Sequence, residues 1–330
     1  MSAQTFLENL MKTPSLSALL LALSLSVATP AMADDFDIAV SYASTQNYSQ
    51  ALPIFKRLAE QGDAGAQNNL GVMYSEGQGV KQDYVQAVAW YRKAAEQGDA
   101  VAQNNLGNMY SNGHGVKQDY AQAVSWYRKA AEQGDVFAQF NLGMIYEYGH
   151  GVKQDYVQAV YWYRKAAEQG DAVAQNNLGD IYRYGYGVKR DDVQAVSWYR
   201  KAAEQGDTFA QFDLGWMYWH GYGVKQDDAQ AAYWFKKAAE QGHTGAQYNL
   251  GVMYSEGQGV RQSHTEALAW YQKAYAQGDA PAAHNIGVSY HNGWGVRQNR
   301  STAKEWFSKA CDLGYQQGCD AYKELNQQGY

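Results

Sequence analysis

Seven histidine residues are the first candidates for chemistry in this sequence, because imidazole is a common metal ligand. No two of them have the H-x-x-x-H or H-E-x-x-H spacing that places two ligands on one face of a helix. His114 and His150 instead occupy the same position of a recurring loop, where other copies carry glutamine, tyrosine or tryptophan. A position that accepts such different side chains is expected to face solvent. We therefore predict no metal site and no cofactor.

A serine nucleophile is the second possible chemistry. Ser301 and Lys304 have the S-x-x-K spacing of penicillin-binding proteins and serine β-lactamases, but the S-D-N and K-T-G motifs that complete such sites are missing. Ser301 can instead cap the helix that follows it. We therefore predict no catalytic residue and no enzyme activity, and a protein that acts on β-lactams or cell-wall material stays an alternative.

The composition narrows the class of protein. Of the 330 residues, 46% are hydrophobic, which is too many for a disordered tail. The formal net charge is -6, whereas a nucleic-acid-binding protein would carry a basic surface, so nucleic acid is not an expected partner. Two cysteines are too few for a cysteine-rich zinc module.

The first segment has the pattern of an export signal. Residues 16–27 form an apolar run that is short for a membrane span, Lys12 precedes it, and Ala31-Met32-Ala33 is a small-x-small cleavage site. Glu8 is unusual before such a run and favours translation from Met11. We predict a signal peptide over residues 1–33, cleavage near Ala33, and a periplasmic or secreted mature protein. No later stretch is apolar enough to cross a membrane.

The rest of the chain repeats one unit. A 36-residue period begins at Ala66 and continues through seven copies without an insertion. We assign the aromatic residues at fixed positions to the core rather than to a carbohydrate or quaternary-ammonium site, because they share a stripe with alanines. One such position holds Trp90, Trp126, Trp162, Trp198, Trp234, Trp270 and Trp306.

Each unit has the pattern of a helical hairpin. Ala66, Leu70 and Tyr74 form an apolar stripe on a first helix. Gly77 and Gly79 lie in the following loop, where glycine readily adopts positive φ. A second helix follows, and an aspartate before each helix is placed to act as its N-cap. One hairpin cannot bury its apolar face alone, so the copies are expected to stack into an all-α, right-handed superhelical solenoid.

The repeated unit reads A-x-x-x-L-G-x-x-Y, then G-x-G-V, then D-x-x-x-A-x-x-W-Y-x-K-A-A-E-Q-G, from about Ala66 to Gln317. This pattern resembles the Sel-1-like repeat, a relative of the tetratricopeptide repeat. The resemblance implies seven repeats over residues 66–317, with a helical hairpin at 34–65 before them and a capping helix at 318–330 after them. By analogy with tetratricopeptide arrays, the first helices line a concave groove in which ligands bind.

Cys311 and Cys319 lie eight residues apart, at the end of the last repeat and in the capping helix. Between antiparallel neighbours this spacing can bring the two sulfurs together, and export supplies an oxidising environment. Cysteine-rich members of the resembled family show a similar spacing. We predict a disulfide; two reduced, buried cysteines are the alternative.

The first helices carry a second stripe of side chains, whose chemistry changes along the chain. It is small or polar in repeats one and two and aromatic in repeats three and five. Exposed apolar surface reduces solubility unless a partner covers it; the alternative is that these rings fill gaps in the core. We expect Asp180 and Arg183 to bind a charged group. The predicted binding residues of this stripe are Phe137, Phe140, Met144, Asp180, Arg183, Phe209, Phe212, Trp216, Trp219 and Tyr248.

A column of asparagines precedes the Leu-Gly pair of the first helices. A similar position in related superhelices presents asparagines to a bound peptide, and an amide can both donate and accept hydrogen bonds. Hydrogen bonds to a neighbouring helix are an equally good explanation. The predicted binding residues of this column are Asn141, Asn177, Asn249 and, in place of an asparagine, Asp213.

These observations predict an exported scaffold or adaptor that binds a peptide or partner protein in the concave groove, centred on repeats three to five. Cell-envelope components are possible further partners. Two alternatives stay open, a protein that acts on the cell wall or on β-lactams and a secreted factor that engages a host receptor.

Overall fold

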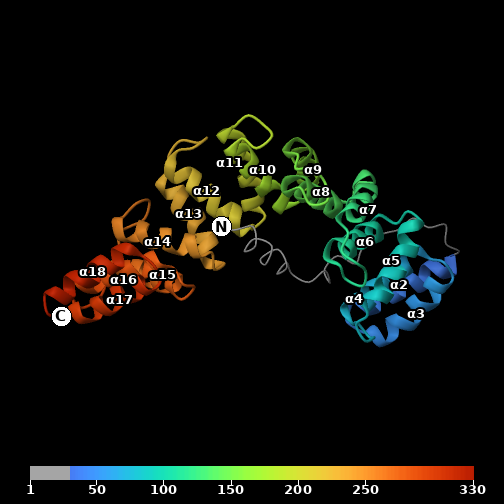
Figure 1. The fold of residues 1–330 in the computed structure, drawn as a ribbon, viewed down its shortest axis with the longest axis horizontal. Coiled ribbons are helices and arrows are strands. Elements are labelled where there is room, and N and C mark those ends of the chain that lie inside the picture. The colour runs from blue at the N-terminus through green and yellow to red at the C-terminus, as the bar shows by residue number, and fades with distance from the viewer. Residues whose placement is uncertain (1–29) are drawn as a thin grey trace. The chain divides into compact units, whose positions relative to one another are not determined.

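The computed structural model describes residues 30–330, and these residues form helices and no strands (Figure 1). The predicted signal peptide falls almost wholly on residues 1–29 and thus lies outside the described residues, as does the predicted translation start at Met11. Helix α2 begins at Pro30. Within the described part of the chain, no helix has both the length and the apolar character needed to span a membrane.

Paired helices follow one another along the chain. The first helices of the repeats are α4 (Ala64–Glu76), α6 (Ala100–Asn112), α8 (Val136–Tyr148), α10 (Ala172–Tyr184), α12 (Thr208–His220), α14 (Thr244–Glu256) and α16 (Ala280–Asn292). The second helices are α5 (Tyr84–Glu96), α7 (Tyr120–Glu132), α9 (Tyr156–Glu168), α11 (Asp192–Glu204), α13 (Asp228–Glu240), α15 (His264–Tyr275) and α17 (Arg300–Asp312). The flanking helices are α2 (Pro30–Ser44), α3 (Tyr48–Glu60) and α18 (Gln316–Gln327).

The chain divides into two compact units, one that ends at Trp162 and one that runs from Tyr163 to Tyr330, with the boundary inside α9. Each unit is described by itself. The first contains α2 to α8, and the second contains α10 to α18. In both units, consecutive hairpins pack side by side as in a solenoid.

The helix boundaries follow the predicted caps. The Asp63 side chain accepts a hydrogen bond from the Ala66 N–H at 2.7 Å, and Asp83 accepts two from the first turn of α5. Gly77 ends α4 with a φ of 72°, the left-handed conformation that glycine adopts without strain. The repeated aspartates and glycines therefore define where most of these helices begin and where the first helices end.

The core lies between the two helices of each hairpin and between neighbouring hairpins. Leu70 is 1% exposed and belongs to a cluster that continues into α3. Gly71 faces the Tyr91 ring so closely that a Cβ there would lie 2.6 Å from a ring carbon. This glycine therefore allows the two helices of the hairpin to approach each other closely.

Glutamine side chains connect successive repeats within each unit. Gln97 donates to the Gln67 side chain at 2.8 Å, and Gln67 donates to the Ala59 carbonyl at 3.0 Å. The same arrangement recurs in the next repeat, where Gln133 donates to Gln103. These amides satisfy one another in the buried interface, as buried polar groups must.

The tryptophans at the fixed position are core residues only in part. Trp126, Trp162 and Trp270 are buried, whereas the other four are half-buried. A lysine three residues later covers the ring; the Lys93 ammonium lies 3.8 Å from the Trp90 ring centre. The position thus combines packing with a cation–π contact at the surface.

The predicted disulfide is confirmed. Cys311 of α17 and Cys319 of α18 are bonded, and their Cα atoms lie 4.5 Å apart. The bond links the last repeat to α18, whose Leu325 packs in one core with Phe307.

Candidate functional site

The predicted binding residues lie on four first helices, in two separate units. Phe137, Phe140, Asn141 and Met144 belong to α8 in the first unit, whereas the other ten lie on α10, α12 and α14 in the second unit. The second-unit residues lie on consecutive repeats, and the structure brings together those of α10 and α12. On α8, Phe137 is 39% exposed, and Phe140, Asn141 and Met144 are half-buried.

The aromatic residues of α12 form one cluster. Phe212, Trp216 and Trp219 are half-buried, with ring centres 6.5 Å apart for the first pair and 6.0 Å for the second. Phe212 and Trp219 also contact Phe235 of α13, so these rings do fill space in the core. Phe209, in contrast, is 50% exposed. The core-filling explanation therefore holds for Phe212 and Trp219, whereas Phe209 stays exposed.

A compensating change accompanies this cluster. In repeats one to four and in repeat six a tyrosine occupies the position of Phe235, and its hydroxyl group can bind a polar residue of the first helix, as Tyr127 does with Asn108 at 2.7 Å. In repeat five the stripe position equivalent to Asn108 is Trp216, which offers no such acceptor. Phenylalanine at 235 avoids a buried hydroxyl without a partner.

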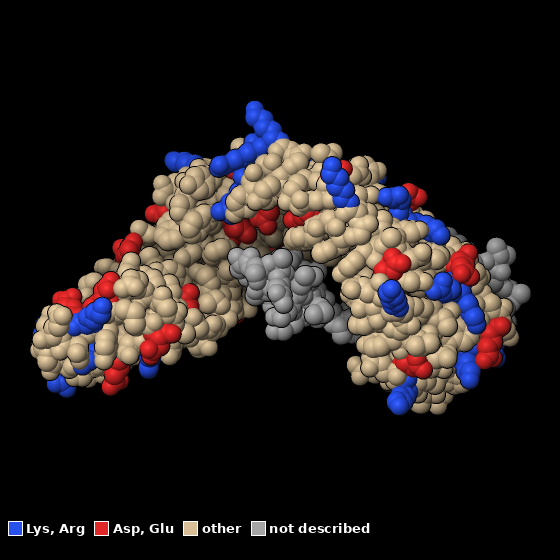
Figure 2. Space-filling view, viewed as in Figure 1, with Lys and Arg blue, Asp and Glu red and all other residues tan. Residues whose placement is uncertain are grey.

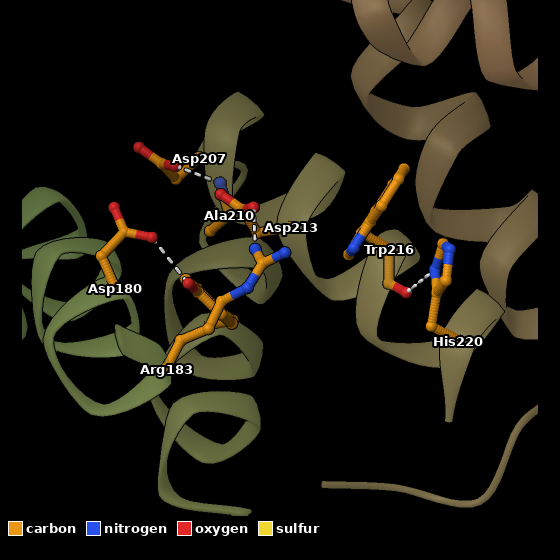
Figure 3. Close-up of polar contacts among 8 residues, drawn as sticks. Asp180, Arg183, Asp207, Ala210, Asp213, Trp216 and His220 are labelled. Carbon is orange, nitrogen blue, oxygen red and sulfur yellow. Dashed lines mark hydrogen bonds and ion pairs between the residues drawn. The ribbon is translucent and has the colours of Figure 1, made fainter. Parts of the chain in front are cut away.

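Two histidines extend the cluster, and the sequence analysis did not assign a role to either. The His220 ring stacks on Trp216 at 4.1 Å, and its Nδ1 lies 3.0 Å from the Trp216 carbonyl (Figure 3). The His243 ring stacks on Phe212 at 4.3 Å. His243 was detectable in the sequence, because the equivalent position in the other repeats is an aspartate.

His243 also caps helix α14. Its Nδ1 accepts a hydrogen bond from the Ala246 N–H at 3.1 Å, which requires a neutral ring. Burial lowers the pKa of His243 to about 4, because the buried ring loses the hydration that a charged imidazole needs. At neutral pH the His243 ring therefore both stacks on Phe212 and accepts the hydrogen bond that caps α14.

The loop after α12 adds to this surface. In repeats two and three the central loop residue stacks on the first residue of the preceding second helix, as His114 does on Tyr84 at 4.7 Å and His150 on Tyr120 at 5.2 Å. His114 is exposed, as the sequence predicts for this position, and the position also provides a stacking contact between repeats. In repeat five the first residue of the preceding second helix, α11, is an aspartate, which has no ring. Tyr222 stacks on His220 instead, with ring centres 5.6 Å apart.

Trp219 is fixed by a further loop contact. Its Nε1 donates to the Gln258 side chain at 3.1 Å, and Gln258 belongs to the loop after α14. Tyr222 remains 43% exposed. We call the set on and beside α12 the α12 aromatic surface; it consists of Phe209, Phe212, Trp216, Trp219, His220 and Tyr222.

Charged residues of α10 and α12 form a network beside this surface (Figure 3). Arg183 and Asp213 pair at 2.8 Å, with side chains only 16% and 19% exposed, and Tyr199 donates to Asp180 at 2.6 Å. Burial, together with the neighbouring Asp180 carboxylate, raises the pKa of Asp213 to about 7, although Arg183 opposes this shift. The predicted charged residues are therefore already engaged with the chain itself.

Part of the asparagine column bonds to neighbouring helices. Asn105 donates to the Asn68 side chain and Asn141 to the Asn104 side chain, each at 3.0 Å. Of the column members predicted to bind a partner, Asn249 is buried and Asn177 is half-buried. In repeats two and three these amides join one first helix to the one before it.

Tyr248 of α14 lies apart from the α12 rings. It is half-buried, its ring centre is 6.0 Å from that of Tyr271, and its side chain is hydrogen-bonded to Asn285. It thus contributes to the contact between repeats six and seven.

The S-x-x-K sequence is occupied by structural contacts. The Lys304 ammonium donates to the Asn326 side chain at 2.7 Å and to the Tyr330 carbonyl. The expectation that Ser301 caps α17 is wrong. The cap is Asn299, whose side chain accepts a hydrogen bond from the Thr302 N–H at 3.0 Å. Among the described residues, no group of three or more His, Cys, Asp or Glu side chains is arranged to hold a metal ion.

Comparisons with known proteins agree with this architecture. The Sel1 repeat family model matches eight consecutive segments, 41–63, 64–99, 100–135, 136–171, 172–207, 208–243, 244–279 and 280–315. No curated protein sequence gives a significant match.

Many solved structures are similar, and two of them share 40% of their residues with this chain over the aligned region. One is c5321, described as a protective antigen present in uropathogenic Escherichia coli strains that displays an SLR fold; it is 40% identical, with a TM-score of 0.86 over 90% of this chain. This chain spans 65% of the length of that antigen. The other is a Sel1 repeat protein from Oxalobacter formigenes, 40% identical, with a TM-score of 0.67 over 73% of this chain and 99% of that one. The chain therefore belongs to the Sel1 repeat family.

Proposed function

We propose that this protein is an exported scaffold or adaptor that binds an extended segment of a partner protein on the α12 aromatic surface. Sel1 repeat proteins generally act in protein–protein interactions. The repeat framework supplies the stacked helices, and the departures of repeat five from the repeat pattern supply the binding residues.

One observation carries the proposal: repeat five gathers Phe209, Phe212, Trp216 and Trp219 on one first helix, whereas the equivalent positions of most other repeats, repeat three apart, hold small, aliphatic or polar residues. Phe209 and Tyr222 are 50% and 43% exposed, beside the half-buried rings of Phe212 and Trp216. Rigid aromatic rings lose little conformational entropy on binding and are frequent energetic centres of protein interfaces. The surface therefore suits a segment that presents apolar side chains.

Export is part of the proposal and rests on two supports. The disulfide between Cys311 and Cys319 needs an oxidising compartment to persist, and the sequence predicts a signal peptide with cleavage near Ala33. Together they favour the periplasm or the extracellular space. The description of the E. coli relative as a protective antigen favours keeping a secreted host-interaction factor as the second candidate.

The test replaces the aromatic residues with those of repeat six. The variant Trp216→Val, Trp219→Ser, Phe235→Tyr reproduces Val252, Ser255 and Tyr271 at the equivalent positions, so it restores a pairing that this chain already folds with. The control Tyr233→Ala removes a 50% exposed ring from α13 and reproduces Ala269 of repeat six.

Partners would be captured by cross-linking from periplasm and culture medium, and their affinities measured for all three proteins. We expect the triple variant to bind about tenfold more weakly or not at all, and the control to bind like the wild type. Equal binding by the triple variant, with circular dichroism unchanged, would remove the α12 aromatic surface from the proposal. Turnover of a β-lactam or of peptidoglycan by the wild type would favour the enzyme alternative.

A further inference from the structure

The other repeats show which hydrogen bonds to expect in the polar network beside the α12 aromatic surface. Where two successive repeats both carry asparagines, the amide nitrogen of one donates to the side-chain oxygen of the other. Asn105 donates to Asn68 in this way, and Asn141 donates to Asn104. The two residues of each pair are 37 positions apart.

Asn176 of repeat four has no such asparagine partner in repeat five. The position 37 residues after Asn176 is Asp213, whose carboxylate, in the ionised form that pairs with Arg183, has no hydrogen to donate. Asn176 is 9% exposed, and its Oδ1 atom is buried without a hydrogen-bond partner. An unpaired buried acceptor destabilises a fold. An asparagine at position 213, as in the other repeats, could donate to this acceptor, yet the chain has an aspartate there.

The surroundings of the orphaned oxygen carry an excess of negative charge. Asp180 and Asp213 share one guanidinium group, that of Arg183, and the Asp207 carboxylate also acts on Asp213. Each carboxylate raises the pKa of a neighbour, Asp180 and Asp207 acting on Asp213, because burial leaves their repulsion poorly screened. Acidic side chains gather on the part of the face in Figure 2 where α10 to α12 lie.

We propose that the partner segment carries a lysine, and that its ammonium group binds between Asn176, Asp180 and Asp213. This inference rests on the proposed function and names the chemistry of the partner at that same surface. An ammonium group brings three donors, enough for the Asn176 oxygen and both carboxylates, and the positive charge that the network lacks. Asp213 and Trp216 are three residues apart on α12, so the aliphatic part of the lysine can pack on the Trp216 ring.

The experiment selects peptides from a random phage-displayed library on the full chain. A selected lysine peptide and its counterpart with norleucine in place of lysine are then measured for affinity. Norleucine keeps the aliphatic chain and lacks the ammonium group. The key variant is Asp213→Asn, which restores the residue that the other repeats carry, and the control is Glu204→Gln, an equal charge change at an exposed position of α11.

We expect lysine to be enriched, and the wild type and Glu204→Gln to prefer the lysine peptide by about tenfold or more. Asp213→Asn should bind both peptides equally and melt at a higher temperature, because its amide can donate to Asn176. An unchanged lysine preference in Asp213→Asn, or no lysine enrichment at all, overturns the inference. A lower melting temperature with unchanged preference would show that Asp213 serves only to hold Arg183.

The outcomes also separate this inference from the proposed function. If the norleucine peptide binds the wild type but not the Trp216→Val, Trp219→Ser, Phe235→Tyr variant, the aromatic surface stands whatever the result for lysine. If peptides bind that variant as well as they bind the wild type, the proposed surface itself is wrong.

Discussion

Repeats two and five share one 36-residue pattern, yet their first helices differ in chemistry. On α6 the second stripe is polar, and its Asn104 and Asn108 form hydrogen bonds to neighbouring helices. On α12 the equivalent residues are Phe212 and Trp216, which pack on other rings. The comparison shows that residues shared by all repeats build the stack, and that residues peculiar to one repeat mark a candidate site.

The largest change in stability is expected at the glycine that both repeats pack against an aromatic ring of the second helix. A Cβ at Gly107 would lie 2.6 Å from the Tyr127 ring, and one at Gly215 would lie 2.8 Å from the Phe235 ring. Gly107→Ala and Gly215→Ala should therefore each destabilise the protein by about 3 kcal/mol through overpacking. Thermal unfolding followed by circular dichroism measures the loss, and a large loss in only one of the two variants would contradict a common framework.

The next prediction concerns the N-cap of α14, where His243 replaces the aspartate of the other repeats and makes the stability depend on pH. The folded-state pKa of His243, about 4, lies below the 6.5 of a free histidine. Between these values the unfolded chain binds the extra proton, so this contribution to stability is complete above pH 6.5 and falls as the pH drops toward 4. At pH 5 the loss should be about 2 kcal/mol.

Local hydrogen exchange of α14 at pH 7 and pH 5 would measure this loss. The control variant His243→Asp restores the cap of the other repeats and should remove the histidine contribution. Equal pH dependence of α14 in the wild type and in this variant would contradict the assigned role of His243.

The smallest change in stability is expected when a tyrosine hydroxyl group is removed from repeat two or added to repeat five. Tyr127→Phe should cost about 1 kcal/mol, because Asn108 loses the hydroxyl that donates to it. Phe235→Tyr, made alone, should cost a similar amount, because the new hydroxyl meets Trp216 and Trp219 rather than a polar acceptor. Combining it with Trp216→Val and Trp219→Ser should recover the loss, and additive effects of the three changes would argue against the pairing.

The sequence predicted the framework well, because the framework depends on contacts close in the chain. An aspartate three residues before its bonded N–H, or a glycine ending a helix, leaves the same mark in every copy. The N-cap aspartates, such as Asp63, and the loop glycine Gly77 were identified in this way, whereas the disulfide at Cys311 was predicted from the eight-residue spacing of the two cysteines.

The candidate site was only partly predictable, because it depends on pairs from different repeats. The Arg183–Asp213 ion pair joins residues 30 positions apart, and the stacking of His243 on Phe212 joins two helices. The spacing of the pattern does not reveal which of these side chains meet. Comparing each repeat with the consensus does show where to look, since His243 and Asp213 each replace the usual residue.

The glutamine contacts between repeats make the array a set of interchangeable modules. Each first-helix glutamine receives a hydrogen bond from the end of the second helix of its own repeat and gives one to the preceding repeat, as Gln103 does with Gln133 and Ala95. Loss of residues 100–135 by recombination would leave Gln139 to donate to Ala95 instead of Ala131, with the same geometry. Unequal crossing-over between near-identical copies can therefore lengthen or shorten the protein by whole repeats, while the specialised repeats pass unchanged to its descendants.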